Sequence, residues 1–147
     1  MDNFKELTEQ LLKTYSNSKS VDDLSIENYF DENISIIGTG EHEFYQNLHE
    51  FLDSYKFDVK RRGKIRIDTR NLCQKEEPLD DHHVLVHGTV DFAGLFEDGS
   101  ICFIMNTRFT IIYRWTGENG WFSICISQFR IRNKWMVRNS LFLWESR

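Results

Sequence analysis

The sequence predicts an α+β fold in which a curved antiparallel sheet wraps around three N-terminal helices. Two observations lead to this prediction. Apolar residues recur at helical spacing in the first third of the chain, and after Gly63 they follow the two-residue alternation of β-strands. Helices that come first and hairpin-linked strands that come later are typical of an α+β domain. A chain of 147 residues also fits one hydrophobic core.

Two helices are expected before the first strand. Ser20 is the expected N-cap of the second helix, because Asp23 stands three residues later in the position of a capping-box partner. This second helix is expected to include Phe30 and to end at residues 31–33. The first helix is predicted from residue 2 to about residue 17 by an apolar stripe at helical spacing: Phe4, Leu7, Leu11 and Tyr15.

A short strand and a third helix are expected next. Residues 34–37 are too few for a helix and are rich in β-branched isoleucine, which predicts a strand. Gly38-Thr39-Gly40 then forms a turn. Glu41 and Glu43 are expected in the first turn of the third helix, where carboxylates complement the helix dipole. The buried stripe of this helix is predicted to be Phe44, Leu48, Phe51 and Tyr55.

Four long strands joined by hairpins are predicted in the rest of the chain. The first runs from residue 65 to a break at Glu76-Glu77-Pro78, and the others span residues 83–96, 101–115 and 121 to about 132. Glycine-containing turns separate the last three strands. Because side chains alternate along a strand, one face of each strand is expected to pack on the helices and the other to face outward.

The outward face of the second and third long strands mixes polar side chains with Leu85, Ile104 and Ile112. Such a mixture suits a protein interface better than open solvent, so we expect a homodimer that pairs through this outer sheet face. Arg108 and Asp91 share the face and are expected to form an ion pair, either across strands or between subunits.

Composition and charge exclude several classes of protein. The net charge of −5 argues against a general nucleic-acid binder. The sequence has no run of about 18 apolar residues, so no membrane span is expected. The mixed-charge N-terminus is unlike a secretory signal. Reduced thiols and a cytoplasmic location are indicated by an odd number of cysteines without a CxxC pattern: Cys73, Cys102 and Cys125.

The histidines are poorly spaced for a metal site. His83 and His87 share a strand face, but four residues of extended chain place them about 13 Å apart, which is too far for one zinc ion. His42 lies beside the glycine turn and is expected to share a face of the third helix with His49. A solvated side chain or a general base both fit His42. No metal or other cofactor is expected.

Three stretches of the sequence resemble the nuclear transport factor 2-like superfamily, and within it the SnoaL-like domains. They are YFDENISIIGTGEHEFYQNLHEFL, VLVHGTVDF and MNTRFTIIYRWTGENGWFSICIS. The resemblance implies a cone-shaped sheet with a pocket at its wide end, in proteins that are often homodimers. We therefore expect a SnoaL-like domain over residues 1–128 and a basic, aromatic extension over residues 129–147. The extension is expected to dock on its own domain or its dimer mate, with an added edge strand and a partner-binding segment as alternatives.

Two departures from the family pattern bear on function. Many SnoaL-like members end the last strand with W-x-I-x-H-x-H, but Cys125 and Ser127 stand at the histidine positions here. Steroid isomerases of the superfamily carry a carboxylate just after the first short strand, where residues 37–40 have none. These departures favour a domain that binds a small apolar ligand or dimerises, without catalysis. The alternative is an isomerase, cyclase or dehydratase that uses Tyr15 and His42 in acid and base roles.

The predicted pocket has mostly aromatic walls and few polar groups, which is typical of small-molecule sites. Its expected residues are Tyr15, Tyr29, Phe30, His42, Phe44, Tyr55, Trp121, Cys125 and Ser127.

Overall fold

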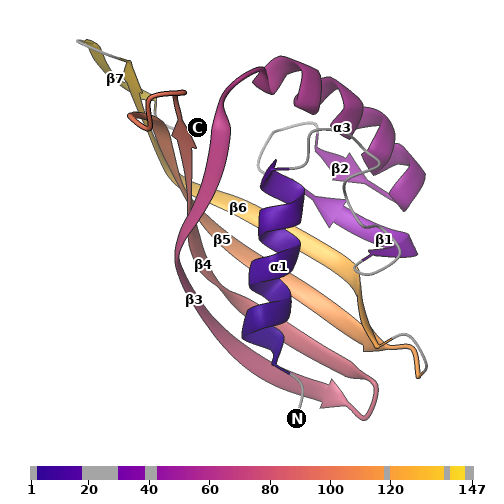
Figure 1. The fold of residues 1–147 in the computed structure, drawn as a ribbon. Coiled ribbons are helices and arrows are strands. Elements are labelled where there is room, and N and C mark those ends of the chain that lie inside the picture. Colours follow the sequence, from indigo (N-terminus) through magenta and orange to yellow (C-terminus); the bar gives the residue numbers. More distant parts are fainter. Residues whose placement is uncertain (1–2, 18–29, 39–42, 118–119, 138–139, 145–147) are drawn as a thin grey trace.

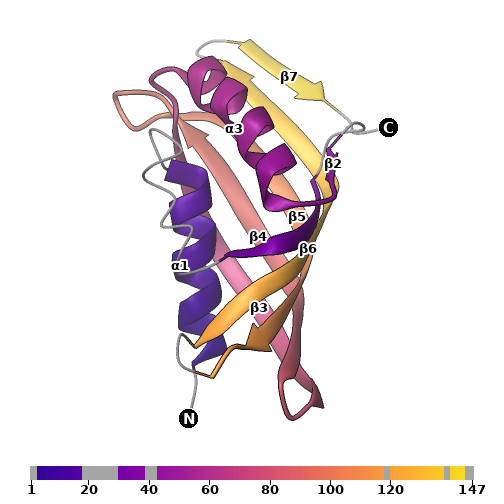
Figure 2. The same cartoon turned by 90° about the vertical axis from the view of Figure 1, so that its right-hand side faces the viewer.

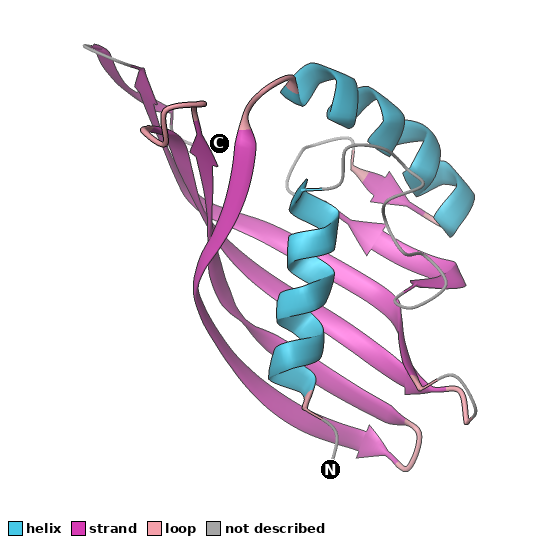
Figure 3. Cartoon of the chain, viewed as in Figure 1, coloured by secondary structure: helices cyan, strands magenta, loops and turns pink. Residues whose placement is uncertain are grey.

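The structure, a computed structural model, describes residues 3–17, 30–38, 43–117, 120–137 and 140–144. Two helices and seven strands lie in these ranges (Figures 1 and 3). The helices are α1 (Phe4–Asn17) and α3 (Leu48–Arg62). The strands are β1 (Phe30–Ile37), β2 (Phe44–Tyr45), β3 (Arg66–Asp80), β4 (His83–Leu95), β5 (Ile101–Trp115), β6 (Trp121–Val137) and β7 (Ser140–Trp144).

All the described strands join one curved sheet, and both described helices lie on its concave side (Figures 1 and 2). The strand order is β2-β1-β6-β5-β4-β3, and β7 also pairs with β6. Strands β3 to β6 are antiparallel neighbours, as predicted. Strand β1 runs parallel to β6, which is a departure from the all-antiparallel expectation. The predicted α+β class with a curved sheet around helices is confirmed.

Helix α1 packs on the concave side and agrees with the first predicted helix. Asn3 precedes it, and its side-chain oxygen accepts a hydrogen bond from the backbone N–H of Glu6 at 3.1 Å, as an N-cap does. The hydroxyl of Thr8 hydrogen-bonds to the Tyr113 phenol at 2.9 Å, so a polar contact also ties α1 to β5. The buried face of the helix includes Phe4, Thr8, Leu11, Leu12 and Ser16.

Strand β1 begins at Phe30, so the prediction that Phe30 and residues 31–33 end a helix is wrong. Phe30 is 4% exposed and stands beside Ser123 of β6 in the register. The carboxylate of Asp31 pairs with the guanidinium of Arg114, which fixes the start of β1 to the sheet. These tertiary contacts override the local helical pattern. The remainder of the predicted second helix lies outside the described ranges.

Helix α3 begins at Leu48, later than predicted. Asn47 is its N-cap, and the Asn47 side chain accepts from the backbone N–H of Glu50 at 2.9 Å. In return, the Glu50 carboxylate accepts from the backbone N–H of Gln46 at 2.8 Å. This reciprocal arrangement resembles a capping box and sets the helix start. The helix ends before Gly63, which takes the positive φ of 60° that glycine adopts readily.

The later start of α3 corrects two further predictions. Glu43 and Phe44 precede the helix, and Phe44 belongs to β2. His42 lies outside the described ranges, so the helical face that it was expected to share with His49 stays a prediction. The other stripe residues are buried as predicted: Leu48, Phe51 and Tyr55. Neither described helix is both long and apolar enough to cross a membrane.

Strand β3 continues to Asp80, so the predicted break at Glu76-Glu77-Pro78 is wrong. This strand lies at the edge of the sheet, and an edge strand tolerates proline because one side of its backbone has no ladder partner. A bulge between Arg70 and Cys73 places Asn71 at φ 56°, a conformation that asparagine adopts more readily than most residues.

The central strands alternate between inner and outer faces as predicted. Val86 on β4 and Ile111 on β5 are fully buried, whereas Arg108 is exposed. The cross-strand form of the predicted ion pair between Arg108 and Asp91 is wrong, because Asp91 stands opposite Asn106 in the register. The alternative, a pair between subunits, stays a prediction. Its carboxylate accepts hydrogen bonds from the amides of Asn106 at 2.6 Å and Asn71 at 2.9 Å.

Strand β6 extends past the predicted end and has two partners on one edge. Its residues 123–127 run beside β1, and residues 133–137 pair with β7. The backbone of residues 129–137 therefore belongs to the main sheet. Residues 140–144 add a strand, which is one of the alternatives expected for the extension. The division of the chain at residue 128 stays a prediction.

Candidate functional site

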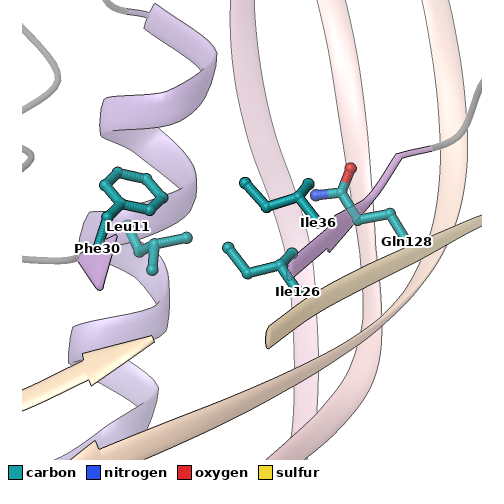
Figure 4. A pocket seen from close by; sticks show the side chains of 5 residues that line it. All are labelled: Leu11, Phe30, Ile36, Ile126 and Gln128. Atoms are coloured by element: carbon teal, nitrogen blue, oxygen red, sulfur yellow. The ribbon is translucent and has the colours of Figure 1, made fainter. Parts of the chain in front are cut away.

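A small cavity lies between α1, β1 and β6 (Figure 4). Its empty volume is about 260 Å³, part of which is open to solvent. The space in which a water-sized sphere can be centred is about 10 Å³, which corresponds to roughly one water molecule. Four of the five lining side chains are apolar and one is an amide: Leu11, Phe30, Ile36, Ile126 and Gln128.

Three elements bring these walls together. Ile36 and Ile126 are register partners in the parallel β1–β6 pair, so they stand side by side on the inner face. Leu11 reaches them from α1 and is 2% exposed. Phe30 closes the other side, with its ring 6.1 Å from that of Phe51 on α3. The cavity is thus framed by parts of the hydrophobic core.

A β-bulge decides which β6 side chains face this cavity. Tyr113 of β5 stands opposite Ser123, whereas the preceding residue, Ile112, stands opposite Cys125. Ile124 has no partner on β5 between these two pairs and is the extra residue of the bulge. Side chains beyond the bulge therefore face the opposite way from what strict alternation predicts.

The prediction that Cys125 and Ser127 face the pocket is wrong for this reason. Opposite residues of an antiparallel pair project to the same face. Ser127 stands opposite Thr110, which belongs to the outer face, and Cys125 is likewise on that face. Ile126 and Gln128 take the inner positions and are 4% and 8% exposed.

Gln128 is the candidate that the sequence analysis missed. It stands opposite the buried Phe109 in the register. Its amide points into the cavity (Figure 4). Within the part of the chain that the structure describes, no group hydrogen-bonds to this amide. Its amide atoms are not among the fully buried polar atoms, so water can reach the amide from the cavity.

Thr107 is a second buried polar group on the same inner face. It is fully buried, and no described residue hydrogen-bonds to its hydroxyl. It lies two residues before Phe109, whose register partner is Gln128. Thr107 and Gln128 are therefore diagonal neighbours on adjacent strands, about 7 to 8 Å apart.

The other predicted pocket residues in the described ranges are spread over the molecule. Phe30 lines the cavity. Tyr55 is buried on α3, with its ring 5.6 Å from that of Phe51. Trp121 packs edge-on against Phe4 at 5.0 Å, near the start of α1. Neither Tyr55 nor Trp121 is among the cavity-lining residues.

Phe44 needs a separate correction, because its side chain is 61% exposed on β2 and does not form a wall of this cavity. Tyr29 and His42 lie outside the described ranges, as does the side chain of Tyr15. The catalytic alternative that uses Tyr15 and His42 therefore stays a prediction.

All three cysteines are free thiols. Burial raises the pKa of Cys125 and also that of Cys102 above the ordinary value for a thiol. Both thiols are therefore protonated at neutral pH and react slowly as nucleophiles. Cys73 on β3 is exposed.

Histidines at the β3–β4 edge pair with carboxylates. The Nδ1 atom of His83 is 2.8 and 2.9 Å from the two carboxylate oxygens of Asp80. The Nε2 atom of His87 is 3.7 Å from an oxygen of Glu77. Hydrogen bonds from the His82 backbone and the His83 ring hold the pKa of Asp80 below its ordinary 3.8. Across the described ranges, no three His, Cys, Asp or Glu side chains come close enough to bind one metal ion.

Comparison with known proteins gives matches in structure only. No protein-family model matches the sequence, and no curated protein shows significant similarity to it. Among solved structures, an NTF2-like protein of unknown function in nutrient uptake from Rhodospirillum rubrum is 19% identical, with a TM-score of 0.59 over 88% of this chain and 99% of that one. The chain has the nuclear transport factor 2-like (NTF2-like) fold.

Other proteins with the NTF2-like fold have different functions. A putative calcium/calmodulin-dependent protein kinase II association domain from Xanthomonas campestris is 11% identical, with a TM-score of 0.69 over 87% of this chain and 85% of that one. A type 2 hexachlorocyclohexane dehydrochlorinase is 12% identical, with a TM-score of 0.67 over 91% and 86%. Identities this low show the fold alone, and the fold does not select among these functions.

The outer face of this NTF2-like sheet carries an exposed apolar pair at its β1–β2 edge. Ile37 and Phe44 are register partners and are 46% and 61% exposed. On the same face, Ile37 stands beside Ser127 of β6, and Ser127 stands beside Thr110 of β5. We define the outer patch as Ser35, Ile37, Phe44, Leu85, Thr110, Ile112, Cys125 and Ser127.

Proposed function

We propose that this chain is a non-catalytic domain that self-associates through the outer patch. The observation that carries the proposal is the exposed pair of Ile37 and Phe44 on one face of the sheet. Large apolar side chains that adjoin on a surface mark interaction sites. Covering these two side chains contributes on the order of 2 kcal/mol from each subunit.

The rest of the outer patch suits the centre of an interface. Its side chains are small or apolar, such as Ser127, Cys125 and Ile112, and none of them carries a charge. Interface cores are similarly depleted of charged residues. A twofold homodimer would use the same patch on both subunits. The kinase association domain, which has the same fold, supports self-association as a role for this chain.

Substitution at the apolar pair tests this proposal. Phe44→Asp replaces a large apolar side chain of the outer patch by a charge and is expected to convert a dimer into a monomer, as measured by size-exclusion chromatography with light scattering. Phe57→Asp is the matched control, because Phe57 is 69% exposed on α3, away from the outer patch. The Phe57 variant should remain dimeric. A wild-type chain that stays monomeric at high concentration would refute self-association.

A second function, binding of a small ligand, is supported by the cavity between α1, β1 and β6. Apolar walls with one polar group are typical of small-molecule sites. The five lining side chains offer no group that exchanges protons near neutral pH, which favours binding over acid–base chemistry. This function predicts that a small apolar probe shifts the methyl resonances of Ile36 and Ile126 in NMR spectra.

A further inference from the structure

Helix α3 carries an exposed aromatic side chain on the side that faces away from the sheet. The helix packs on β1 and β2 (Figure 1), and its residues Phe51 and Tyr55 are buried. Phe57 follows Tyr55 by two residues, which is about 200° around the helix axis, and it is 69% exposed. No other large apolar side chain in the described ranges is more exposed. Packing of the core therefore does not explain a phenylalanine at this position.

Basic side chains surround Phe57 at the C-terminal end of α3. Lys60 and Arg61 stand three and four residues after Phe57, so they lie on the same face about one turn further along the helix. Both are exposed, and no described residue forms an ion pair with either of them. Lys56 precedes Phe57, and Lys64 follows the helix end. We define the α3 basic face as Lys56, Phe57, Lys60, Arg61 and Lys64.

Nearby carboxylates neutralise only part of the α3 basic face. The ammonium of Lys56 is 3.9 Å from Asp53, and that of Lys64 is 3.3 Å from Glu97. Ion pairs between exposed side chains are weak, so both lysines can still meet another anion. The net charge of −5 opposes the binding of anions, but at physiological ionic strength its effect falls off over about 8 Å. The local charge around Phe57 therefore decides what binds there.

We propose that the α3 basic face docks on the surface of an anionic lipid bilayer. The anionic head groups pair with the basic side chains, and the Phe57 ring enters the boundary between head groups and hydrocarbon. A bilayer offers both contacts without a groove of its own, which suits a convex helix face. A folded protein would need a complementary groove, and a nucleic acid would offer phosphate without hydrocarbon.

This membrane contact is separate from the self-association proposed above. The outer patch lies on the outer face of the sheet, whereas α3 lies on the concave side (Figures 1 and 2). A chain can therefore use the α3 basic face whether it is a monomer or a dimer. Failure of either proposal leaves the other in place.

Vesicle co-sedimentation with two lipid compositions tests the proposal. The full chain is mixed with vesicles of phosphatidylcholine alone, or with vesicles of phosphatidylcholine and phosphatidylserine in equal amounts. We expect binding to the vesicles that contain phosphatidylserine and not to the others. This binding should disappear when salt is added, because salt screens the charges. Equal binding to both compositions, or no binding to either, would overturn the proposal.

Two variants of the α3 basic face locate the contact. The double substitution Lys60→Gln and Arg61→Gln is expected to weaken binding roughly 25-fold, at about fivefold for each cation near an anionic surface. Phe57→Ser is expected to weaken binding roughly tenfold, because an apolar ring no longer leaves water. All three side chains are exposed, so these changes should leave the fold intact.

Matched controls remove the same chemistry elsewhere. The double substitution Lys5→Gln and Lys13→Gln removes two exposed cations from α1, and Leu79→Ser removes an exposed apolar side chain from β3. Both controls should bind the vesicles nearly as tightly as the wild type. If they lose as much affinity as the α3 variants, net charge or general hydrophobicity explains the binding, and the proposal is wrong.

A single-stranded DNA oligonucleotide distinguishes the other source of phosphate. It is titrated into the chain at the same phosphate concentration as the vesicles. Weaker binding of the DNA than of the phosphatidylserine vesicles is expected. Tighter binding of the DNA that is lost in Phe57→Ser would make a nucleic acid the partner of the α3 basic face and would overturn the proposal.

Discussion

Thr8 and Thr107 are both fully buried, yet among the described residues only Thr8 has a hydrogen-bond partner for its hydroxyl. The Thr8 bond to Tyr113 joins α1 to the sheet in a region without access to water. Removing one partner of such a pair leaves the other buried without a hydrogen bond, and the protein then bears the full desolvation cost of that group. A hydroxyl that already lacks a partner has no such bond to lose.

This difference predicts that two conservative substitutions change the free energy of unfolding by different amounts. Tyr113→Phe should lower the free energy of unfolding by about 1 to 3 kcal/mol, because it leaves the Thr8 hydroxyl buried without its hydrogen bond to Tyr113. Thr107→Val should leave the free energy of unfolding nearly unchanged or raise it, since it replaces an unpartnered hydroxyl by a methyl group. Urea unfolding of both variants measures the effects. A loss for Thr107→Val as large as that for Tyr113→Phe would contradict this account.

Side-chain direction on β6 was the least predictable feature at this scale. The family resemblance placed Cys125 and Ser127 in the pocket, but the unpaired Ile124 shifts the alternation so that both residues face outward. Whether a strand contains a bulge depends on its pairing with a neighbour, which a single sequence does not reveal. The misplacement of these two residues and the omission of Gln128 have this one cause.

Secondary-structure elements with strong local signals were predicted well. Strand β5 has the predicted bounds, and β4 differs from its predicted bounds only at the last residue. The signal that separates the two strands is Gly99, which takes the positive φ of 85° that a tight turn requires. Elements whose bounds depend on competing local signals or on contacts far along the chain were predicted poorly. The start of α3 depends on the capping bonds of Asn47 and Glu50. The prediction instead placed the start at Glu41 and Glu43, which precede this capping pair in the sequence. The start of β1 depends on Arg114, which lies far along the sequence.

The turn between β3 and β4 is expected to make stability depend on pH. Asp80 accepts hydrogen bonds from the His82 backbone and the His83 ring, and these hold its pKa below 3.8. A carboxyl group with a lowered pKa in the folded state stabilises the protein above its unfolded pKa, and the effect disappears as pH falls through the folded pKa.

Comparison of Asp80→Asn with the wild type tests this dependence. The variant should have the lower melting temperature at about pH 6, and the difference should shrink as pH falls below 3.8 and vanish near about pH 2. Thermal unfolding followed by circular dichroism gives both curves. A difference that stays constant through the acidic range would show that the Asp80 carboxylate does not contribute in this way.

At the scale of the whole molecule, the fold could be predicted because element order and hairpin signals agree with each other. The change from helical to strand periodicity after Gly63 was sufficient to predict a sheet around helices. Function was harder to predict, because the NTF2-like fold occurs in proteins as different as an association domain and a dehydrochlorinase. The outer patch and the cavity are therefore the features of this chain from which a function is proposed.

The central claim is that two copies of the chain meet at the outer patch, and alkylation of Cys125 tests it most directly. Cys125 belongs to the outer patch, whereas exposed Cys73 on β3 lies outside it and serves as an internal reference. Iodoacetamide labelling is followed by mass spectrometry over a series of protein concentrations. We predict that Cys125 labelling slows relative to Cys73 as concentration rises. A ratio of the two rates that is independent of concentration would contradict the claim.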